Sequence, residues 1–177
     1  DYWKKSWEQN GWEAYVLDED YLDKQDKYYI NLKFDNFYES NLCKTTIDFS
    51  CEYTRACYLR WFAYYQFAKE HGVIFHADYD AINYGLTPDS RRIEVNRMLN
   101  HCNSAGKQNK FGLIAILETF LSVQNGEVDY KLIHPTNKTS DLFVSRRLLN
   151  APVCHPRICM APNEKLMLGT HNQGRIV

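Results

Sequence analysis

Six cysteines and their spacing constrain the fold more than any other feature of this sequence. Two of them, Cys51 and Cys57, lie in the segment CEYTRACYLRW, which is predicted to be helical. On an intact helix six residues rise about 9 Å, whereas a disulfide requires Cα atoms within about 7 Å. The two side chains also point about 120° apart, so they are poor joint ligands for one metal ion. We therefore expect each to bond to a different segment. The predicted disulfide cysteines are Cys43, Cys51, Cys57, Cys102, Cys154 and Cys159.

Several pairings remain open, because six cysteines allow 15 connectivities. A bond between Cys57 and Cys102 would join two core helices. Cys154 and Cys159 lie in the proline-bearing segment CHPRIC, and bonds from them to the first two cysteines would hold the C-terminal tail against the body. Each such bond would add roughly 2–4 kcal/mol of stability.

The cysteine count also indicates the compartment. An even number of cysteines is typical of proteins from oxidising environments. Asn137, Lys138 and Thr139 form an N-glycosylation sequon, so Asn137 is a predicted glycosylation site. The chain opens on Asp1 and not on Met, which we interpret as a mature chain whose leader has been removed or left out. Together these features predict a secreted, extracellular protein.

The charge pattern argues against two classes of partner. The chain has 21 basic and 22 acidic residues, without a long run of Lys or Arg. A nucleic-acid or anionic-membrane partner would require such a run or patch. No apolar stretch approaches the roughly 20 residues of a membrane-spanning helix. We therefore expect neither a nucleic-acid nor a membrane partner.

Apolar residues recur at the helical period through most of the chain, which predicts an all-α fold. Thr45 or Thr46 is expected to cap a long aromatic helix that Gly72 ends. Thr87 is expected to cap another helix, which continues to Cys102. Further helices are predicted around Trp3 and Trp7, within 19–38, over 110–123 and over 140–149.

The predicted architecture is a compact, disulfide-stapled helical domain of about five to seven helices. It spans 1–177 as a single domain, with 151–177 as an irregular tail held by disulfides. Pro152, Pro156 and Pro162 disfavour a regular element in that tail. The segment VIFHADYDAINYG is less regular, and we expect a loop or an extended piece there.

No pattern in the chain indicates catalysis. The motifs GxSxG, HExxH, GxGxxG and the P-loop are absent from the sequence. His101 beside Cys102, and His155 between Cys154 and Cys159, would suit zinc in a cytosolic protein. Bridged cysteines and solvated histidines are favoured, because the cysteine number is even and a sequon is present. We expect no enzyme activity, no cofactor and no metal. A secreted hydrolase would need a His–carboxylate–nucleophile geometry that the sequence does not display.

Aromatic residues are abundant, with 13 Tyr, 9 Phe and 4 Trp. Aromatic side chains fill cores, and they also line pockets for flat or apolar ligands. Tyr58, Trp61 and Tyr65 share the long helix, and Phe120 lies on the apolar helix that follows. These four residues are predicted to line a ligand pocket. The alternative is that they belong to an ordinary core.

Residues 55–133 resemble the insect odorant-binding superfamily, and most nearly its salivary branch in blood-feeding flies. The likeness lies in RACYLRWFAYYQFAKEHGVI, then Cys102, then LIAILETFLSVQNGEVDYKL. The family's second helix cysteine would fall at Trp61. Amine-binding members carry an Asp-x-x-Glu pair, of which Asp129 matches the first position while Leu132 occupies the second. The resemblance implies a pocket for a small hydrophobic or amine ligand, with Asp129 as its polar contact.

A second resemblance leads to a different function. CEYTRAC is similar to the Cys-Tyr-Cys signature of the bicycle proteins, which are tyrosine-rich secreted effectors of gall-forming aphids. The later pair, CHPRIC, contains no tyrosine. This resemblance implies recognition of a host macromolecule through the surface. The sequence thus predicts a secreted, non-enzymatic insect salivary or effector protein that acts on a host. As a monomer, it would bind either a small ligand in an aromatic pocket or a host protein.

Overall fold

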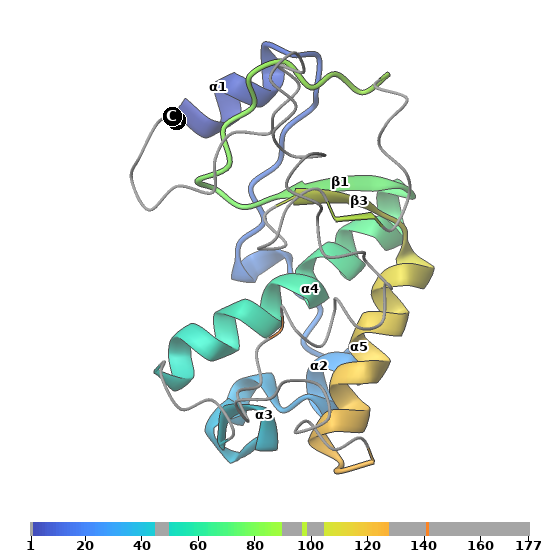
Figure 1. Cartoon of the computed structure of the whole chain (residues 1–177). Helices are drawn as coiled ribbons and strands as arrows, with labels where there is room; N and C mark the ends of the chain where they lie inside the picture. The colour runs from blue at the N-terminus through green and yellow to red at the C-terminus, as the bar shows by residue number, and fades with distance from the viewer. Residues whose placement is uncertain (1, 45–49, 90–96, 99–104, 128–140, 142–177) are drawn as a thin grey trace. The chain divides into compact units, whose positions relative to one another are not determined.

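The computed structural model describes residues 2–44, 50–89, 97–98, 105–127 and 141, and these are coloured in Figure 1. Internal packing divides the chain into two compact units. The first unit holds the described residues of 1–17 and 75–108, and the second those of 18–74 and 109–150. The N-terminal residues form a core of their own, and the single domain over 1–177 stays a prediction. The predicted tail at 151–177 lies outside the described residues.

A tryptophan cluster forms the core of the first unit. Helix α1 (Tyr2–Glu8) confirms the predicted N-terminal helix. From it, the buried Trp7 ring packs against Trp12, with ring centroids 5.8 Å apart. Trp7 Nε1 donates a hydrogen bond to the Ala81 carbonyl (3.0 Å), and Trp12 Nε1 donates to the Leu86 carbonyl (2.7 Å). Both indole N–H groups therefore find acceptors, as buried indoles require. Trp3, Ala14, Phe75 and Ala77 complete the cluster.

A small sheet of three strands belongs to the same part of the chain. Strands β1 (Ile74–Ala77), β2 (Arg97–Met98) and β3 (Ala105–Gln108) lie in the order β1-β3-β2. Strands β2 and β3 are antiparallel, with Met98 opposite Gly106. The helix predicted through Met98 is therefore wrong, because backbone pairing with a strand replaces local helical hydrogen bonds. The extended piece predicted after Gly72 is present as β1.

The second unit is helical and contains a disulfide. The predicted all-α class is confirmed in that helices dominate the described residues, although the small sheet was not predicted. No helix in the described part of the chain is both long enough and apolar enough to cross a bilayer. The helical elements of this unit, labelled in part in Figure 1, are η1 (Glu19–Tyr21), α2 (Lys27–Asn31), η2 (Phe34–Glu39), α3 (Asn41–Lys44), α4 (Cys51–His71) and α5 (Lys110–Gln124).

The long aromatic helix α4 begins one turn later than the sequence indicated. Ser50 is its N-cap, and its hydroxyl accepts a hydrogen bond from the Tyr53 backbone N–H (3.2 Å). A serine oxygen in this position satisfies an N–H group that lacks a helical partner. The threonines predicted to cap the helix lie within 45–49, outside the described residues. Gly72 ends the helix with φ of 82°, as predicted.

Helix α5 confirms the apolar helix predicted over 110–123. Asn109 is its N-cap, and Asn109 Oδ1 accepts a hydrogen bond from the Gly112 N–H (2.9 Å). The helix packs against α4, where the Tyr58 ring meets the Phe120 ring edge-on with centroids 4.7 Å apart. The two long helices therefore share one aromatic core.

The segment before α4 is broken into short helical pieces, although its apolar residues recur near the helical period. Asp26 caps α2, and its Oδ1 accepts from the Tyr28 N–H (2.9 Å). Asp26 Oδ2 accepts from Gln66 Nε2 (3.1 Å) and from Lys69 Nζ (3.4 Å) on α4. Lys33 then takes a left-handed conformation with φ of 57°. Polar anchoring to α4 and this reversal prevent one continuous helix.

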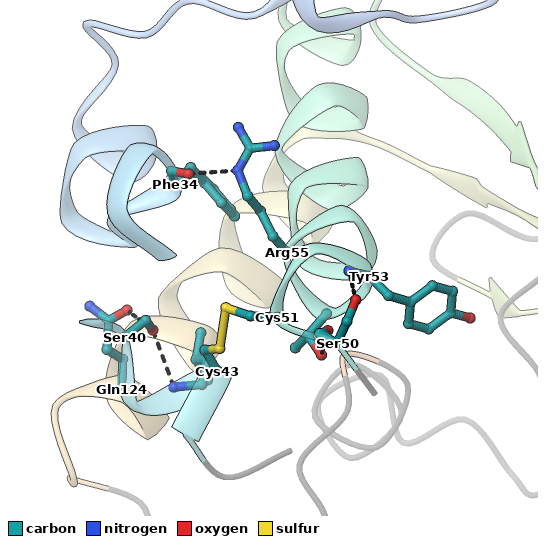
Figure 2. The surroundings of a disulfide bond; sticks show 10 residues. Phe34, Ser40, Cys43, Ser50, Cys51, Tyr53, Arg55 and Gln124 are labelled. Carbon is teal, nitrogen blue, oxygen red and sulfur yellow. Dashed lines mark hydrogen bonds between the residues drawn. A yellow bond between two sulfur atoms is a disulfide. The ribbon is translucent and has the colours of Figure 1, made fainter. Parts of the chain in front are cut away.

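The disulfide joins Cys43 at the end of α3 to Cys51 at the start of α4, with Cα atoms 5.6 Å apart (Figure 2). The predicted bonds from these two cysteines to the tail are therefore wrong. Cys51 is the first residue of α4, and its Cα lies within bonding range of the Cys43 Cα. The prediction that Cys51 bonds to a segment other than its own helix is confirmed.

Candidate functional site

The four aromatic residues predicted to line a pocket lie in the core of the second unit. Tyr58, Trp61 and Phe120 are 0% exposed, and Tyr65 is 8% exposed. Beyond the Tyr58–Phe120 contact, the Tyr65 ring meets Tyr28 edge-on, with centroids 5.4 Å apart. Each ring therefore fills space beside another ring. The contacts fit the alternative reading of these residues as an ordinary aromatic core.

A buried carboxylate forms the polar centre of this core. Asp141 Oδ2 accepts hydrogen bonds from Arg60 Nη2 (2.6 Å), Arg60 Nε (3.2 Å) and Trp61 Nε1 (2.9 Å). The Asp141 side chain is 5% exposed, and that of Arg60 is 25% exposed. Burying a carboxylate is tolerable only with such charge-assisted partners. No sequence signal marked this group, because Asp141 lies 81 residues from Arg60.

Tyr53 and Cys57 form a second pair of polar side chains on α4. Tyr53 is exposed on the first turns of the helix, and Cys57 follows one turn later. The nearby Cys57 thiol, together with partial burial, raises the pKa of the Tyr53 phenol, whereas Arg60 lowers it. Cys57 is outside the Cys43–Cys51 bond. Its predicted partner Cys102 lies outside the described residues.

Several tyrosine hydroxyls of the second unit are fixed by carboxylates. Burial, followed by the hydrogen bond to Glu70, raises the pKa of Tyr21 to about 12. Burial, followed by a hydrogen bond to a carboxylate, also raises the pKa values of Tyr28 and Tyr29. These phenols therefore act as neutral donors at physiological pH. The hydrogen bonds are Tyr21 to Glu70 (2.7 Å), Tyr28 to Glu118 (2.5 Å) and Tyr29 to Asp35 (2.7 Å).

Other tyrosines face the solvent. Among the described residues, ten large apolar side chains are exposed, and six of these are tyrosines. Tyr79 is the most exposed, at 86%. The number of tyrosines is known from the sequence, but residue type alone could not separate buried rings from exposed ones. The exposed tyrosines are Tyr2, Tyr15, Tyr79 and Tyr84 in the first unit, and Tyr38 and Tyr53 in the second.

The described residues contain no cluster of three or more His, Cys, Asp or Glu that could hold a metal ion. His76, on β1, is buried at 3% exposure. The zinc ligands considered from the sequence all lie outside the described residues. So do the predicted polar contact Asp129, the sequon residue Asn137 and the tail cysteines Cys154 and Cys159.

Comparisons with known proteins leave the two family resemblances as expectations. No family model, no curated protein and no solved structure matches the chain. The function must therefore be argued from the chain's own residues.

Proposed function

We propose that this chain is a secreted, non-enzymatic protein that recognises a partner protein through its exposed tyrosines. The observation that carries the proposal is the predominance of tyrosine among the exposed large apolar side chains of the described residues. Tyrosine is enriched in recognition surfaces, because it combines a large rigid ring with a hydroxyl and loses little conformational entropy on binding. A protein partner is the class of molecule that such a surface fits best.

The packing of the core supports surface recognition over the carrier function. A carrier would use the buried rings of the second unit to enclose its ligand. There, Tyr58 and Phe120 are in edge-to-face contact, and the Trp61 ring is fully buried beside Asp141. A ligand between these rings would have to displace contacts that stabilise the fold.

The disulfide supports the secreted part of the proposal. Disulfides form and persist in oxidising compartments and are rare in the cytosol. The Cys43–Cys51 bond joins two helices of the second unit. An extracellular protein partner is therefore the appropriate class to test.

The experiment compares two triple variants as bait in extracellular fluid. One removes exposed tyrosines of the first unit, as Tyr2→Ser, Tyr79→Ser and Tyr84→Ser. The matched control removes exposed aliphatic residues, as Val16→Ser, Ile30→Ser and Val73→Ser. The protein recovered with the wild type is then purified, and its dissociation constant is measured for all three chains by calorimetry. Loss of a few central aromatic residues commonly weakens binding by tenfold or more.

We expect the tyrosine variant to bind at least about tenfold more weakly and the control to bind within about threefold of the wild type. Equal affinities of the two variants would contradict the proposal. Stoichiometric binding of the small apolar probe 1-anilinonaphthalene-8-sulfonate to the folded wild type would instead support the carrier function. Thermal unfolding of each variant, measured by circular dichroism, checks that the fold is retained.

A further inference from the structure

The two sulfur atoms of the disulfide lie in different electrostatic surroundings. Cys51 is the first residue of α4, a helix of 21 residues, whereas Cys43 is the third residue of the four-residue helix α3. The free N–H groups of a helix's first turn carry partial positive charge, and the free carbonyls of its last turn carry partial negative charge. A thiolate is therefore stabilised at Cys51 and is not stabilised at Cys43.

The neighbour of Cys51 already displays this effect. Glu52, in the first turn of α4, accepts a hydrogen bond from its own backbone N–H and a second from the Ser50 hydroxyl, and these bonds lower its carboxyl pKa. The first turn thus stabilises a negative charge. Glu52 also competes with a thiolate at Cys51, because two negative charges in one turn repel each other.

Two basic residues also lie close to the disulfide in the described sequence. Lys44 follows Cys43 directly, and its charge favours a thiolate at Cys43, but its side chain is exposed and therefore screened by solvent. Arg55 lies one turn after Cys51, but its Nε donates to the Phe34 carbonyl (2.6 Å) and its Nη1 pairs with Glu19 (2.9 Å), as the view in Figure 2 shows for Phe34. Arg55 is therefore engaged away from the sulfur atoms. Asp48, between the two cysteines in the chain, lies outside the described residues.

Helix α3 has contacts that do not depend on the disulfide. Ser40 Oγ donates to Gln124 Oε1 (2.8 Å), and Asn41 Nδ2 donates to the Gln124 carbonyl (2.8 Å). Gln124 Nε2 in turn donates to the Asn31 carbonyl (2.6 Å). Leu42, the residue after Asn41, is fully buried. These contacts connect α3 and the preceding Ser40 to α5 without the disulfide.

We propose that Cys43–Cys51 is a thiol-exchangeable disulfide in which an external thiolate attacks Cys43 and Cys51 leaves, with the reduced chain remaining folded. Both cysteine residues are half-buried, so neither is closed off from the solvent. The attacking thiolate forms a bond to Cys43 Sγ, and the electron pair of the broken S–S bond stays on Cys51 Sγ. A second thiolate releases the first as an external disulfide and leaves Cys43 as a thiol. The proposal is independent of the protein's partner.

Glutathione is the probe, and the sequence makes the products easy to separate. The oxidised full chain is treated with reduced glutathione, quenched with acid after short times and digested with trypsin. Cleavage after Lys44 and Arg55 places Cys43, Cys51 and Cys57 on three different peptides. Mass spectrometry then reports which cysteine carries glutathione.

We expect glutathione on Cys43 in about threefold or greater excess over Cys51 at early times, since the thiol of lower pKa is the better leaving group. In the reduced chain, alkylation of Cys51 by iodoacetamide should reach half its maximal rate about one pH unit or more below that of Cys43. Glu52→Gln removes the competing charge and should widen both differences. Glu8→Gln, the same charge change in the first unit, should leave both unchanged.

Two results would overturn the proposal. The first is equal labelling of Cys43 and Cys51, or a preference for Cys51, in the wild type. The second is loss of the helical circular dichroism signal on reduction, because a disulfide required for folding is not an exchangeable one. Retention of the signal with labelling of Cys43 supports the assignment.

Discussion

Removal of the Asp141 carboxylate should destabilise the second unit through two separable losses. In Asp141→Ala, the Trp61 indole N–H loses its acceptor at a site where the ring is 0% exposed. A buried donor left unsatisfied costs about 1–3 kcal/mol. Arg60 loses its ion pair as well. Breaking a buried pair costs about 3–5 kcal/mol, and we take about 1–2 kcal/mol because a quarter of the Arg60 side chain is exposed. The expected total is about 3 kcal/mol.

Asp141→Asn is the matched control, because its amide oxygen can still accept the Trp61 hydrogen bond while the charge is lost. Asp141→Asn should lower the free energy of unfolding by about half as much as Asp141→Ala does. The free energies of unfolding are measured by urea denaturation of the wild type, the two Asp141 variants, Trp61→Phe and the double variant. In the Trp61→Phe background, Asp141→Ala should cost about 1–3 kcal/mol less, since no indole donor remains to be orphaned. The argument would be contradicted if the losses in free energy of unfolding from Asp141→Ala and Trp61→Phe simply added in the double variant. A loss below about 1 kcal/mol in Asp141→Ala would contradict it as well.

Two further predictions concern the disulfide and the tyrosines. The double variant Cys43→Ser, Cys51→Ser removes a cross-link with a sequence separation of 8. From the loop-entropy relation, this loss lowers the free energy of unfolding by about 2.5 kcal/mol. The variant should unfold at lower urea concentration, and an unchanged midpoint would contradict this. The free energy of unfolding should also fall as the pH rises from 10 towards 12. The pKa of Tyr21 is about 12 in the folded chain, whereas an ordinary tyrosine has a pKa of 10.0, so the unfolded state loses its proton first. Urea midpoints measured from pH 8 to 11.5 should therefore decrease less in Tyr21→Phe than in the wild type, and equal decreases would argue against the Tyr21–Glu70 contact.

Elements that depend on local chemistry could be predicted from the amino-acid sequence. The helical period and the end signals identified the N-terminal helix, α5 and most of α4, including its end at Gly72. These features repeat every turn or occupy the first and last residues of a helix, so a short window contains all the information they need. The geometry of one helix was likewise sufficient to exclude a bond between Cys51 and Cys57.

Contacts between residues far apart in the sequence became known only from the folded structure. The partner of Cys51 depends on the contact of α3 with α4, and the strand at Met98 depends on pairing with Gly106. The exposure of each tyrosine depends on which elements cover it. The ion pair between Arg60 and Asp141 joins residues that no local pattern connects. Burial and pairing of this kind result from packing over the whole unit, and for this reason residue type and spacing could not reveal them.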